Sequence, residues 1–265
     1  MIITQTSTQF EKSQVNCLFL QLFQIIGVTL KGLLERNFDK LSPQALENIK
    51  LTLFKVFYDP NANIRSTVAT VLTTLFTKIG NLGWQEIISF IASNLDQSDQ
   101  DVVETSLECI SNIFEDMKTN SENINLSDNK TGSIFSSLAL KLIMMCDPKY
   151  PRKIKELSIH CLNIFIQSVD HNLLNDYFNI LLLYSEDQDP SLRLKSCEGF
   201  LETLELRRDL ILQYLDQTFE RVLKFTADEN YQVRKIACRF WSEYLLYEKG
   251  ESQNRILVVQ KILDL

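Results

Sequence analysis

The chain of 265 residues contains 34 acidic and 27 basic side chains, which gives a formal net charge of −7. This acidic balance disfavours direct binding of nucleic acid, whose phosphates need clustered lysine and arginine. Only 7 glycines and 5 prolines interrupt a sequence rich in helix-forming residues, which predicts an all-α protein and argues against a large β-sheet. No apolar run approaches the roughly 20 residues that cross a bilayer, and residues 1–16 lack the basic start and apolar core of a signal peptide. We therefore expect no membrane insertion, and a protein of the cytoplasm or the nucleus.

The elements predicted in chain order are consecutive pairs of helices that follow a flexible terminus at residues 1–16. The first helix of each pair is predicted at residues 43–57, 84–95, 133–146, 171–185 and 209–226. The second helix of each pair is predicted at residues 63–79, 101–116, 152–168, 191–206 and 231–247. Apolar residues recur at helical spacing within them, as at Val68, Leu72 and Leu75. Ser42 followed by Pro43 is typical of a helix start.

A recurring junction precedes the second helix of each pair. In its three close copies a polar turn contains an Asp that lies six residues before an Arg, and the Arg opens the next helix. These copies are Asp59 with Arg65, Asp187 with Arg193, and Asp228 with Arg234. We expect the carboxylate of the turn to meet the guanidinium of the same copy, because charge-assisted pairs of this kind are strong. The pairing could then repeat along the chain as a ladder.

Two degenerate copies of the junction, at Glu104 and Lys155, complete a repeat along the chain. The marker positions 65, 104, 155, 193 and 234 are separated by 39, 51, 38 and 41 residues. A period of about 40 residues with two helices is typical of HEAT repeats. We therefore predict one α-α superhelix, a HEAT-repeat solenoid of about five helix pairs that spans residues 1–265. The longer step places a polar inter-repeat insertion at residues 117–133.

The residues that could carry chemistry have a simpler structural interpretation. The six cysteines are widely separated without metal-like spacing, so we expect reduced thiols, no metal and no cofactor. Cys197 and Cys238 lie four residues after their marker arginines, where the first complete repeat has Ala69, and are predicted to be small packing residues. Trp84 and Trp241 are predicted to anchor the core. With no nucleophile set, catalytic residues are not expected and the protein is not predicted to be an enzyme.

Several segments in order resemble one protein family. They are Gly27-Val28-Thr29-Leu30-Lys31, Asp59-Pro60 with Ile64-Arg65-Ser66-Thr67-Val68, Gly80-Asn81-Leu82-Gly83-Trp84, Ile113-Phe114-Glu115-Asp116, Leu204-Glu205-Leu206-Arg207-Arg208-Asp209, and Ala237-Cys238-Arg239-Phe240-Trp241. Over about residues 26–248 the sequence is similar to the amino-terminal HEAT-repeat portion of transportins, nuclear import receptors of the karyopherin-β (importin-β) superfamily. The chain stops before the family's acidic loop and carboxy-terminal arch, so we expect a fragment or a short relative.

The resemblance implies a function and a set of partners. It implies binding of Ran-GTP and a part in nuclear import of proteins through the nuclear pore. In the full-length receptor it also implies cargo proteins with a basic nuclear-localisation signal, nucleoporins, and shuttling between cytoplasm and nucleus. The alternative that the residues leave open is a HEAT-repeat scaffold subunit of a multiprotein assembly, similar to a phosphatase scaffold, because fold alone does not fix function.

Two acidic ridges are the candidate partner-binding residues. A solenoid presents its second helices on a concave face, where exposed stripes can contact a partner continuously. Glu104, Glu108 and Glu115 share one face of the helix predicted at 101–116, together with Ser111. A second ridge on the helix predicted at 191–206 is formed by Glu198, Glu202 and Glu205, beside Lys195. The alternative interpretation is that both ridges are solvated helix faces.

Overall fold

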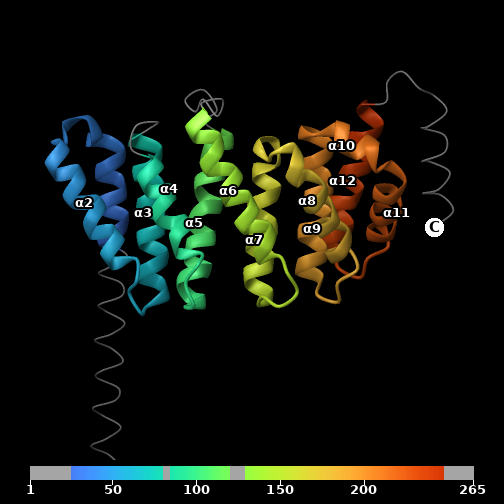
Figure 1. Ribbon diagram of the computed structural model, residues 1–265, viewed down its shortest axis with the longest axis horizontal. Helices are drawn as coiled ribbons and strands as arrows, with labels where there is room; N and C mark the ends of the chain where they lie inside the picture. The colour runs from blue at the N-terminus through green and yellow to red at the C-terminus, as the bar shows by residue number, and fades with distance from the viewer. Residues whose placement is uncertain (1–24, 80–83, 120–128, 248–265) are drawn as a thin grey trace, which may run out of the picture. The chain divides into compact units, whose positions relative to one another are not determined.

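The computed structural model describes residues 25–79, 84–119 and 129–247 (Figure 1). The predicted flexible terminus at residues 1–16 lies outside these ranges. Within them the chain forms helices joined by short turns, and no β-strand occurs among the described residues. No helix in the described part of the chain is long and apolar enough to cross a membrane. The predicted all-α fold class is confirmed.

The helices follow the predicted pairs closely. Residues 25–37 form a helix that precedes the first pair and leads into the 3-10 helix η1 (Phe38–Lys40). The first helices are α2 (Pro43–Val56), α4 (Trp84–Asn94), α6 (Asn129–Met145), α8 (His171–Tyr184), and α10 (Arg208–Gln213) with α11 (Leu215–Thr226). The second helices are α3 (Ala62–Ile79), α5 (Gln100–Thr119), α7 (Arg152–Phe165) with the 3-10 helix η4 (Ile166–Ser168), α9 (Pro190–Leu206) and α12 (Tyr231–Tyr247). The described residues therefore contain the five predicted helix pairs.

The predicted insertion at residues 117–133 is partly helical. Helix α5 continues to Thr119 and α6 begins at Asn129, so both helices extend into this range. Residues 120–128 lie outside the described part of the chain. Within the predicted range, residues 117–119 and 129–133 are therefore helical.

One predicted helix, at residues 209–226, is divided into α10 and α11. Tyr214 has φ −118° and ψ 32°, which is not helical, and it separates the two elements. Its ring stacks on Phe178 of α8 with 4.4 Å between ring centroids. Its hydroxyl donates a hydrogen bond of 2.8 Å to Asn175 Oδ1. These contacts with α8 stabilise a break that apolar periodicity alone does not predict.

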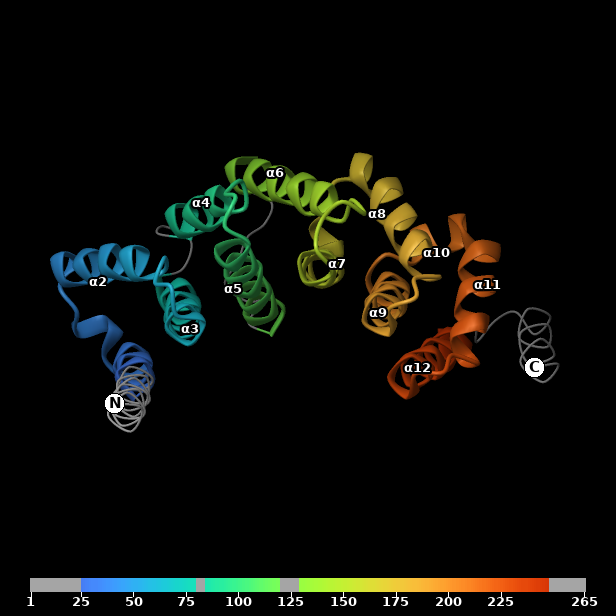
Figure 2. The ribbon, with the colours of Figure 1, turned by 90° about the horizontal axis from the view of Figure 1, so that it is seen from below.

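The chain divides into two compact units. Unit 1 comprises Met1–Asn125 and unit 2 comprises Leu126–Leu265. In unit 1, α2 and α4 form one layer, while the helix at residues 25–37, α3 and α5 form the other (Figure 2). In unit 2, α6, α8, α10 and α11 form one layer, and α7, α9 and α12 form the other (Figure 2). We call the layer that contains α3 and α5 the second-helix layer of unit 1. The layer that contains α7, α9 and α12 is the second-helix layer of unit 2. The single solenoid over residues 1–265 stays a prediction.

Apolar stripes between the two layers form the core of each unit. Val68, Leu72 and Leu75 of α3 are buried, as the helical spacing predicts, and so are Phe200 and Leu204 of α9. Each buried aliphatic or aromatic side chain of this size contributes about 1.5–3 kcal/mol by leaving water. The apolar stripe of each helix therefore supplies the stability that the helix would lack in isolation.

The start of α2 is confirmed in detail. The Ser42 hydroxyl accepts a hydrogen bond of 3.2 Å from the Ala45 N–H, and Pro43 occupies the first helical turn. This cap satisfies one of the N–H groups that a helix start leaves unpaired. Gly80, which belongs to one of the segments that resemble the family, lies outside the described residues. The side chain of Trp84 is not described either, so its role in the core stays a prediction.

At the junctions the prediction about Asp and Arg is wrong in one respect. The guanidinium of each marker arginine donates to the main-chain carbonyl of the Asp six residues earlier, instead of pairing with its carboxylate. The distances are 2.8 Å for Arg65 to Asp59 O, 2.9 Å for Arg193 to Asp187 O and 2.6 Å for Arg234 to Asp228 O. Each Asp carboxylate accepts from the backbone N–H two residues on, at 2.8 Å in all three copies. The carboxylate therefore shapes the turn and is not positioned to face its own arginine.

The ladder of ion pairs exists, but it joins consecutive repeats. Arg65 Nη2 of α3 lies 3.1 Å from Asp101 Oδ2 at the start of α5. Arg193 of α9 makes a two-pronged pair with Asp228, at 2.6 Å from Nε to Oδ2 and 2.9 Å from Nη2 to Oδ1. Each arginine thus ties the turn before its own helix to the junction that opens the second helix of the next repeat.

Acidification should weaken the Arg193–Asp228 connection. The Arg193 guanidinium, with the Asn230 N–H, lowers the pKa of Asp228 below its ordinary value. A carboxylate whose folded-state pKa is lowered stabilises the fold above its unfolded pKa of about 3.9, and this stability is lost as the pH falls through the folded-state pKa. Urea unfolding at a series of pH values measures this effect. At neutral pH the free energy of unfolding of the wild type should exceed that of Asp228→Asn, and this difference should shrink in acid. A difference that stays constant down to pH 2 would contradict this assignment.

The small-residue prediction is confirmed for Cys197 and wrong for Cys238. Cys197 is buried beside α12, with its Sγ 3.9 Å from Val233 O, as Ala69 is buried beside Cys109 of α5. Cys238 is exposed, whereas Ala237 next to it is buried. Ala69 and Cys197 are each covered by the second helix of the following repeat, and no described residue takes that place for Cys238. Trp241 is buried and its indole N–H donates 3.2 Å to Thr226 Oγ1, which confirms its predicted role in the core.

Candidate functional site

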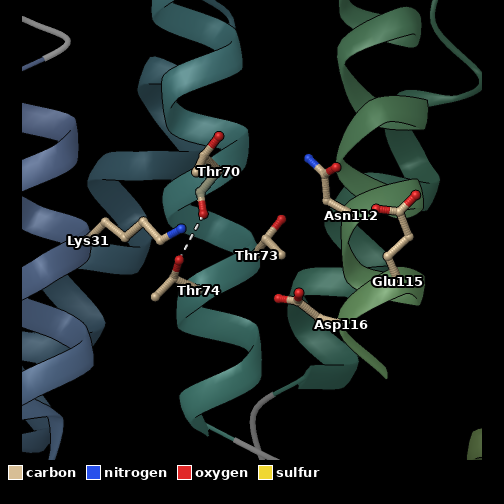
Figure 3. A pocket seen from close by; sticks show the side chains of 7 residues that line it. All are labelled: Lys31, Thr70, Thr73, Thr74, Asn112, Glu115 and Asp116. Atoms are coloured by element: carbon tan, nitrogen blue, oxygen red, sulfur yellow. Dashed lines mark hydrogen bonds between the residues drawn. The ribbon is translucent and has the colours of Figure 1, made fainter. Parts of the chain in front are cut away.

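A polar cleft opens in the second-helix layer of unit 1 (Figure 3). Its volume is about 310 Å³. The residues that line it are Lys31, Thr70, Thr73, Thr74, Asn112, Glu115 and Asp116. They come from the helix at residues 25–37, from α3 and from α5, and we call this site the threonine cleft. Its walls belong to three successive second-layer helices, so a single partner segment could contact all of them.

Threonine hydroxyls of α3 form one wall of the cleft. The Oγ1 atoms of Thr70, Thr73 and Thr74 each donate to the carbonyl four residues earlier, at 3.0–3.1 Å. Such back-bonding lets a β-branched polar residue stay inside a helix while its hydroxyl remains near the helix backbone. The threonine hydroxyls are therefore held against the backbone of α3 and give the cleft a polar surface.

Carboxylates of α5 lie on one side of the α3 threonines, and Lys31 lies on the other (Figure 3). Asp116 Oδ2 lies 3.1 Å from Thr77 Oγ1 of α3, whose single proton also points to the Thr73 carbonyl at 3.0 Å. Glu115 is exposed and also lines the cleft. Lys31 stands on the far side, 3.9 Å from Glu35 Oε1, with its ammonium turned toward Thr70 and Thr74 (Figure 3). The cleft thus has a cationic end and an anionic end.

The first predicted ridge lies on α5 beside this cleft. Glu104 and Glu108 are half-buried and Glu115 is exposed, so the three carboxylates are accessible to different degrees. Ser111, which the sequence placed on the same ridge, is buried. The structure therefore brings Glu115 into the threonine cleft and leaves Glu104 and Glu108 nearer the start of α5.

The second predicted ridge lies on α9 in unit 2 and is already engaged within the chain. Glu198 Oε2 lies 2.8 Å from Lys195 Nζ on the same helix. Glu205 Oε1 lies 2.8 Å from Arg239 Nη2 of α12. Glu202 is half-buried. A partner that binds α9 would have to compete with these pairs.

Burial keeps two titratable side chains, His160 and Cys109, neutral near pH 7. Burial, together with Lys195 and Lys153, lowers the pKa of His160 to about 4, so its imidazole is neutral near pH 7. Burial raises the pKa of the Cys109 thiol in unit 1 to about 12, which removes its thiolate at neutral pH. In the described part of the chain no group of three or more His, Cys, Asp or Glu side chains could hold a metal ion.

Sequence reasoning identified only Glu115 among the residues that line the cleft. The missed residues are Lys31, Thr70, Thr73, Thr74, Asn112 and Asp116. A weak signal exists, because Thr67, Thr70, Thr74 and Thr77 follow one another at spacings of three and four along α3. The approach of Asp116 to Thr77, however, joins residues that are 39 positions apart. Only the packing of α3 against α5 places them together.

The chain was compared with protein families and with individual proteins, and both comparisons give matches. The Vacuolar 14 Fab1-binding region family matches residues 152–241, which lie in unit 2. Transportin of Dictyostelium discoideum is 28% identical over 223 residues, which are 82% of this chain and 23% of that protein. The chain therefore spans less than a quarter of the length of this relative.

Solved structures show the same fold. Importin beta in a polyethylene glycol condition matches with a TM-score of 0.68 and 14% identity, over 92% of this chain and 33% of that chain. A Kap95:Nup1 complex matches with a TM-score of 0.64 and 14% identity, over 83% of this chain and 27% of that chain. These matches confirm the predicted HEAT-type solenoid fold. The predicted resemblance is confirmed as well: the chain is similar in sequence to transportins of the karyopherin-β superfamily and shares the helical-repeat fold of importin beta.

Proposed function

We propose that this chain is part of a nuclear transport receptor and binds Ran-GTP through the second-helix layer of unit 1. The observation that carries the proposal is sequence similarity to a transportin over 82% of the chain. The relative is a transport receptor by name and not an enzyme, which agrees with a role in binding. The chemistry of such a role is complementarity of surfaces, and no covalent step is required.

The charge distribution supports a partner with a basic face. Carboxylates of α5 line the second-helix layer of unit 1, from Glu104 near the start of the helix to Glu115 near its end. Residues 91–130 hold nine acidic side chains against two lysines, so this part of the chain is strongly acidic. An acidic surface accelerates the encounter with a basic partner and loses this advantage as salt rises.

In the complete receptor we propose the further partners that a transport role requires. They are cargo proteins with a basic nuclear-localisation signal and nucleoporins, with shuttling between cytoplasm and nucleus as the result. The similarity in fold to Kap95 in a complex with Nup1 supports nucleoporins as the kind of partner. A HEAT-repeat scaffold subunit of a phosphatase-like assembly is the other function considered, and no observation on this chain favours it.

Titration with Ran in both nucleotide states tests the proposal. We expect the GTP form to bind and the GDP form not to bind. The double reversal Glu104→Lys/Glu108→Lys should slow association about tenfold at low salt and reduce its salt dependence, because it replaces attraction by repulsion. Stopped-flow fluorescence at several salt concentrations measures both effects.

A matched reversal controls for net charge. Asp216 and Glu220 on α11 are exposed and have the same four-residue spacing as Glu104 and Glu108, but they lie outside unit 1. Asp216→Lys/Glu220→Lys should leave association nearly unchanged. Equal binding of both nucleotide states, or of neither while a complete transportin binds, would refute the proposed function and favour a scaffold.

A further inference from the structure

One side of α11 carries an apolar stripe that the described residues cover only in part. Leu215, Phe219 and Leu223 follow one another at a spacing of four, so they share one side of the helix, and each is half-buried. The counterparts of the first two, 41 residues earlier on α8, are Leu174 and Phe178, which are 3% and 0% exposed. We call the three residues of α11 the α11 stripe. It lacks a cover that the same positions have in the preceding repeat.

The preceding repeat shows which kind of element supplies this cover. Phe178 and Phe219 each meet a ring on the second helix of their own pair, Phe200 at 5.6 Å and Trp241 at 5.0 Å between centroids. Phe178 is also stacked against Tyr214, which belongs to the first-helix segment of the following pair, at 4.4 Å. Among the described residues no ring of a further first helix reaches Phe219. The α11 stripe is therefore suited to the first helix of a following pair.

Residues 252–265 lie outside the described part of the chain, and their sequence has the pattern of such a helix. Ile256, Val259 and Leu263 have the i, i+3, i+7 spacing that is typical of one apolar helix face. The segment offers 14 residues, as many as α8 contains. It could therefore form a helix of the same length as the first helix of the fourth pair.

The chain delivers this segment close to the α11 stripe. The rings of Phe219 and Tyr244 are 4.8 Å apart, and α12 ends three residues after Tyr244, at Tyr247. Four residues, 248–251, connect that end to the segment, which is a usual length for a connection between packed helices. A short connection of this kind gives the segment a high effective concentration beside the stripe.

We propose that residues 252–265 bind the α11 stripe as an amphipathic helix and close the end of unit 2. The face formed by Ile256, Val259 and Leu263 packs on the stripe. A helix of this length is marginal in water by itself, so its stability has to come from burial of this face. The same burial removes the stripe from water, as solenoid ends require for solubility. The inference concerns unit 2 and does not depend on binding of Ran-GTP.

Hydrogen exchange of the full chain, followed by mass spectrometry of the fragments that cover residues 252–265, tests this contact. We expect the amides of the segment to exchange about tenfold or more slowly than those of an unstructured chain. Val259→Asn should abolish this protection, because it places a polar amide in the contact. Leu257→Asn is the matched control, since Leu257 lies about 160° around the helix from Val259 and should keep the protection.

A second pair of variants tests the stripe itself. Leu215→Glu puts a carboxylate in the first turn of α11, where it suits the helix dipole, and should also abolish the protection of residues 252–265. Leu183→Glu is its control, because Leu183 lies on α8 in the same unit and is 54% exposed, and it should leave the protection unchanged. Exchange of α7 and α9 in the same data reports whether unit 2 stays folded.

The outcomes decide between the possible occupants of the stripe. Exchange of the wild-type segment at the unstructured rate, or equal exchange in Val259→Asn and Leu257→Asn, would overturn the inference. Protection that survives Leu215→Glu in a folded unit 2 would place the segment elsewhere and overturn it as well. Protection that disappears on dilution would show that a second copy of the chain supplies the helix, which contradicts the intramolecular contact. If Leu215→Glu unfolded unit 2, the two variants of the segment would decide the question.

Discussion

Replacing Gly199 with alanine is expected to lower the free energy of unfolding of unit 2 by about 3 kcal/mol, the cost of forcing a methyl group into a packed core. A Cβ at this position would meet Leu181 Cδ2 at 2.4 Å, Asn163 Oδ1 at 2.7 Å and the Tyr177 hydroxyl at 2.9 Å. Two of these groups belong to a buried polar network. Tyr177 donates 2.9 Å to Asn163 Oδ1, and Asn163 Nδ2 donates 2.8 Å to Lys195 O. Displacing them would leave buried polar groups unpaired, which costs further stability.

The sign of the expected change in stability is informative. At a helical position with free space around it, replacing glycine with alanine stabilises the protein by about 1 kcal/mol. Gly32 provides the control. The nearest atom to a Cβ there is Nη2 of Arg36 at 3.1 Å, at the end of a flexible side chain that can move. Urea denaturation followed by circular dichroism should show Gly199→Ala destabilised and Gly32→Ala unchanged or stabilised. If both variants were equally stable, the close approach of α8 and α9 at Gly199 would be wrong.

Replacing Arg193 with alanine is expected to cost about 3 kcal/mol, because it removes one partner of a largely buried ion pair. The side chains of Arg193 and Asp228 are 17% and 7% exposed, and two hydrogen bonds join them. The guanidinium also donates to the carbonyls of Asp187 and Gln188 at 2.9 Å. The variant would therefore leave the Asp228 carboxylate without its guanidinium and release the turn before α9.

Arg152 is the matched control for this prediction. It also pairs with an aspartate of the following repeat, at 2.7 Å from Asp189 Oδ2, but its side chain is 60% exposed. Water and salt screen such a pair, so Arg152→Ala should unfold at nearly the wild-type urea concentration. If Arg193→Ala and Arg152→Ala lowered the free energy of unfolding by similar amounts, burial would not determine how strongly these ion pairs connect the repeats.

The elements themselves could be predicted from the sequence because their signals are local. Apolar spacing over one helix and caps such as Ser42 fix where helices begin and which face is buried. The junctions were found for the same reason, since an Asp and an Arg six residues apart mark one turn and one helix start. The break at Tyr214 was missed because its stabilising partners, Asn175 and Phe178, belong to another helix.

The candidate site followed from the sequence only in part. Glu115 was predicted from the spacing of acidic residues along α5, and the structure places it in the threonine cleft. Glu198 and Glu205 were predicted by the same pattern, and the structure pairs them with Lys195 of α9 and Arg239 of α12. A stripe of charges on one helix does not say which neighbouring helix supplies counter-charges. Contact with Ran-GTP at any of these residues stays a prediction.

By itself the sequence determined an all-α chain of HEAT-type helix pairs, its junctions and its resemblance to transportins, because each of these is written in residues close together along the chain. Tertiary structure alone decided which carboxylate each marker arginine meets, as with Arg65 and Asp101, and which cysteine is covered. It also decided that Thr77 meets Asp116 and that α3, α5 and the helix at residues 25–37 together line a polar cleft. These features depend on the register between helices of consecutive repeats, which is set by how buried side chains interlock and not by the spacing within either helix.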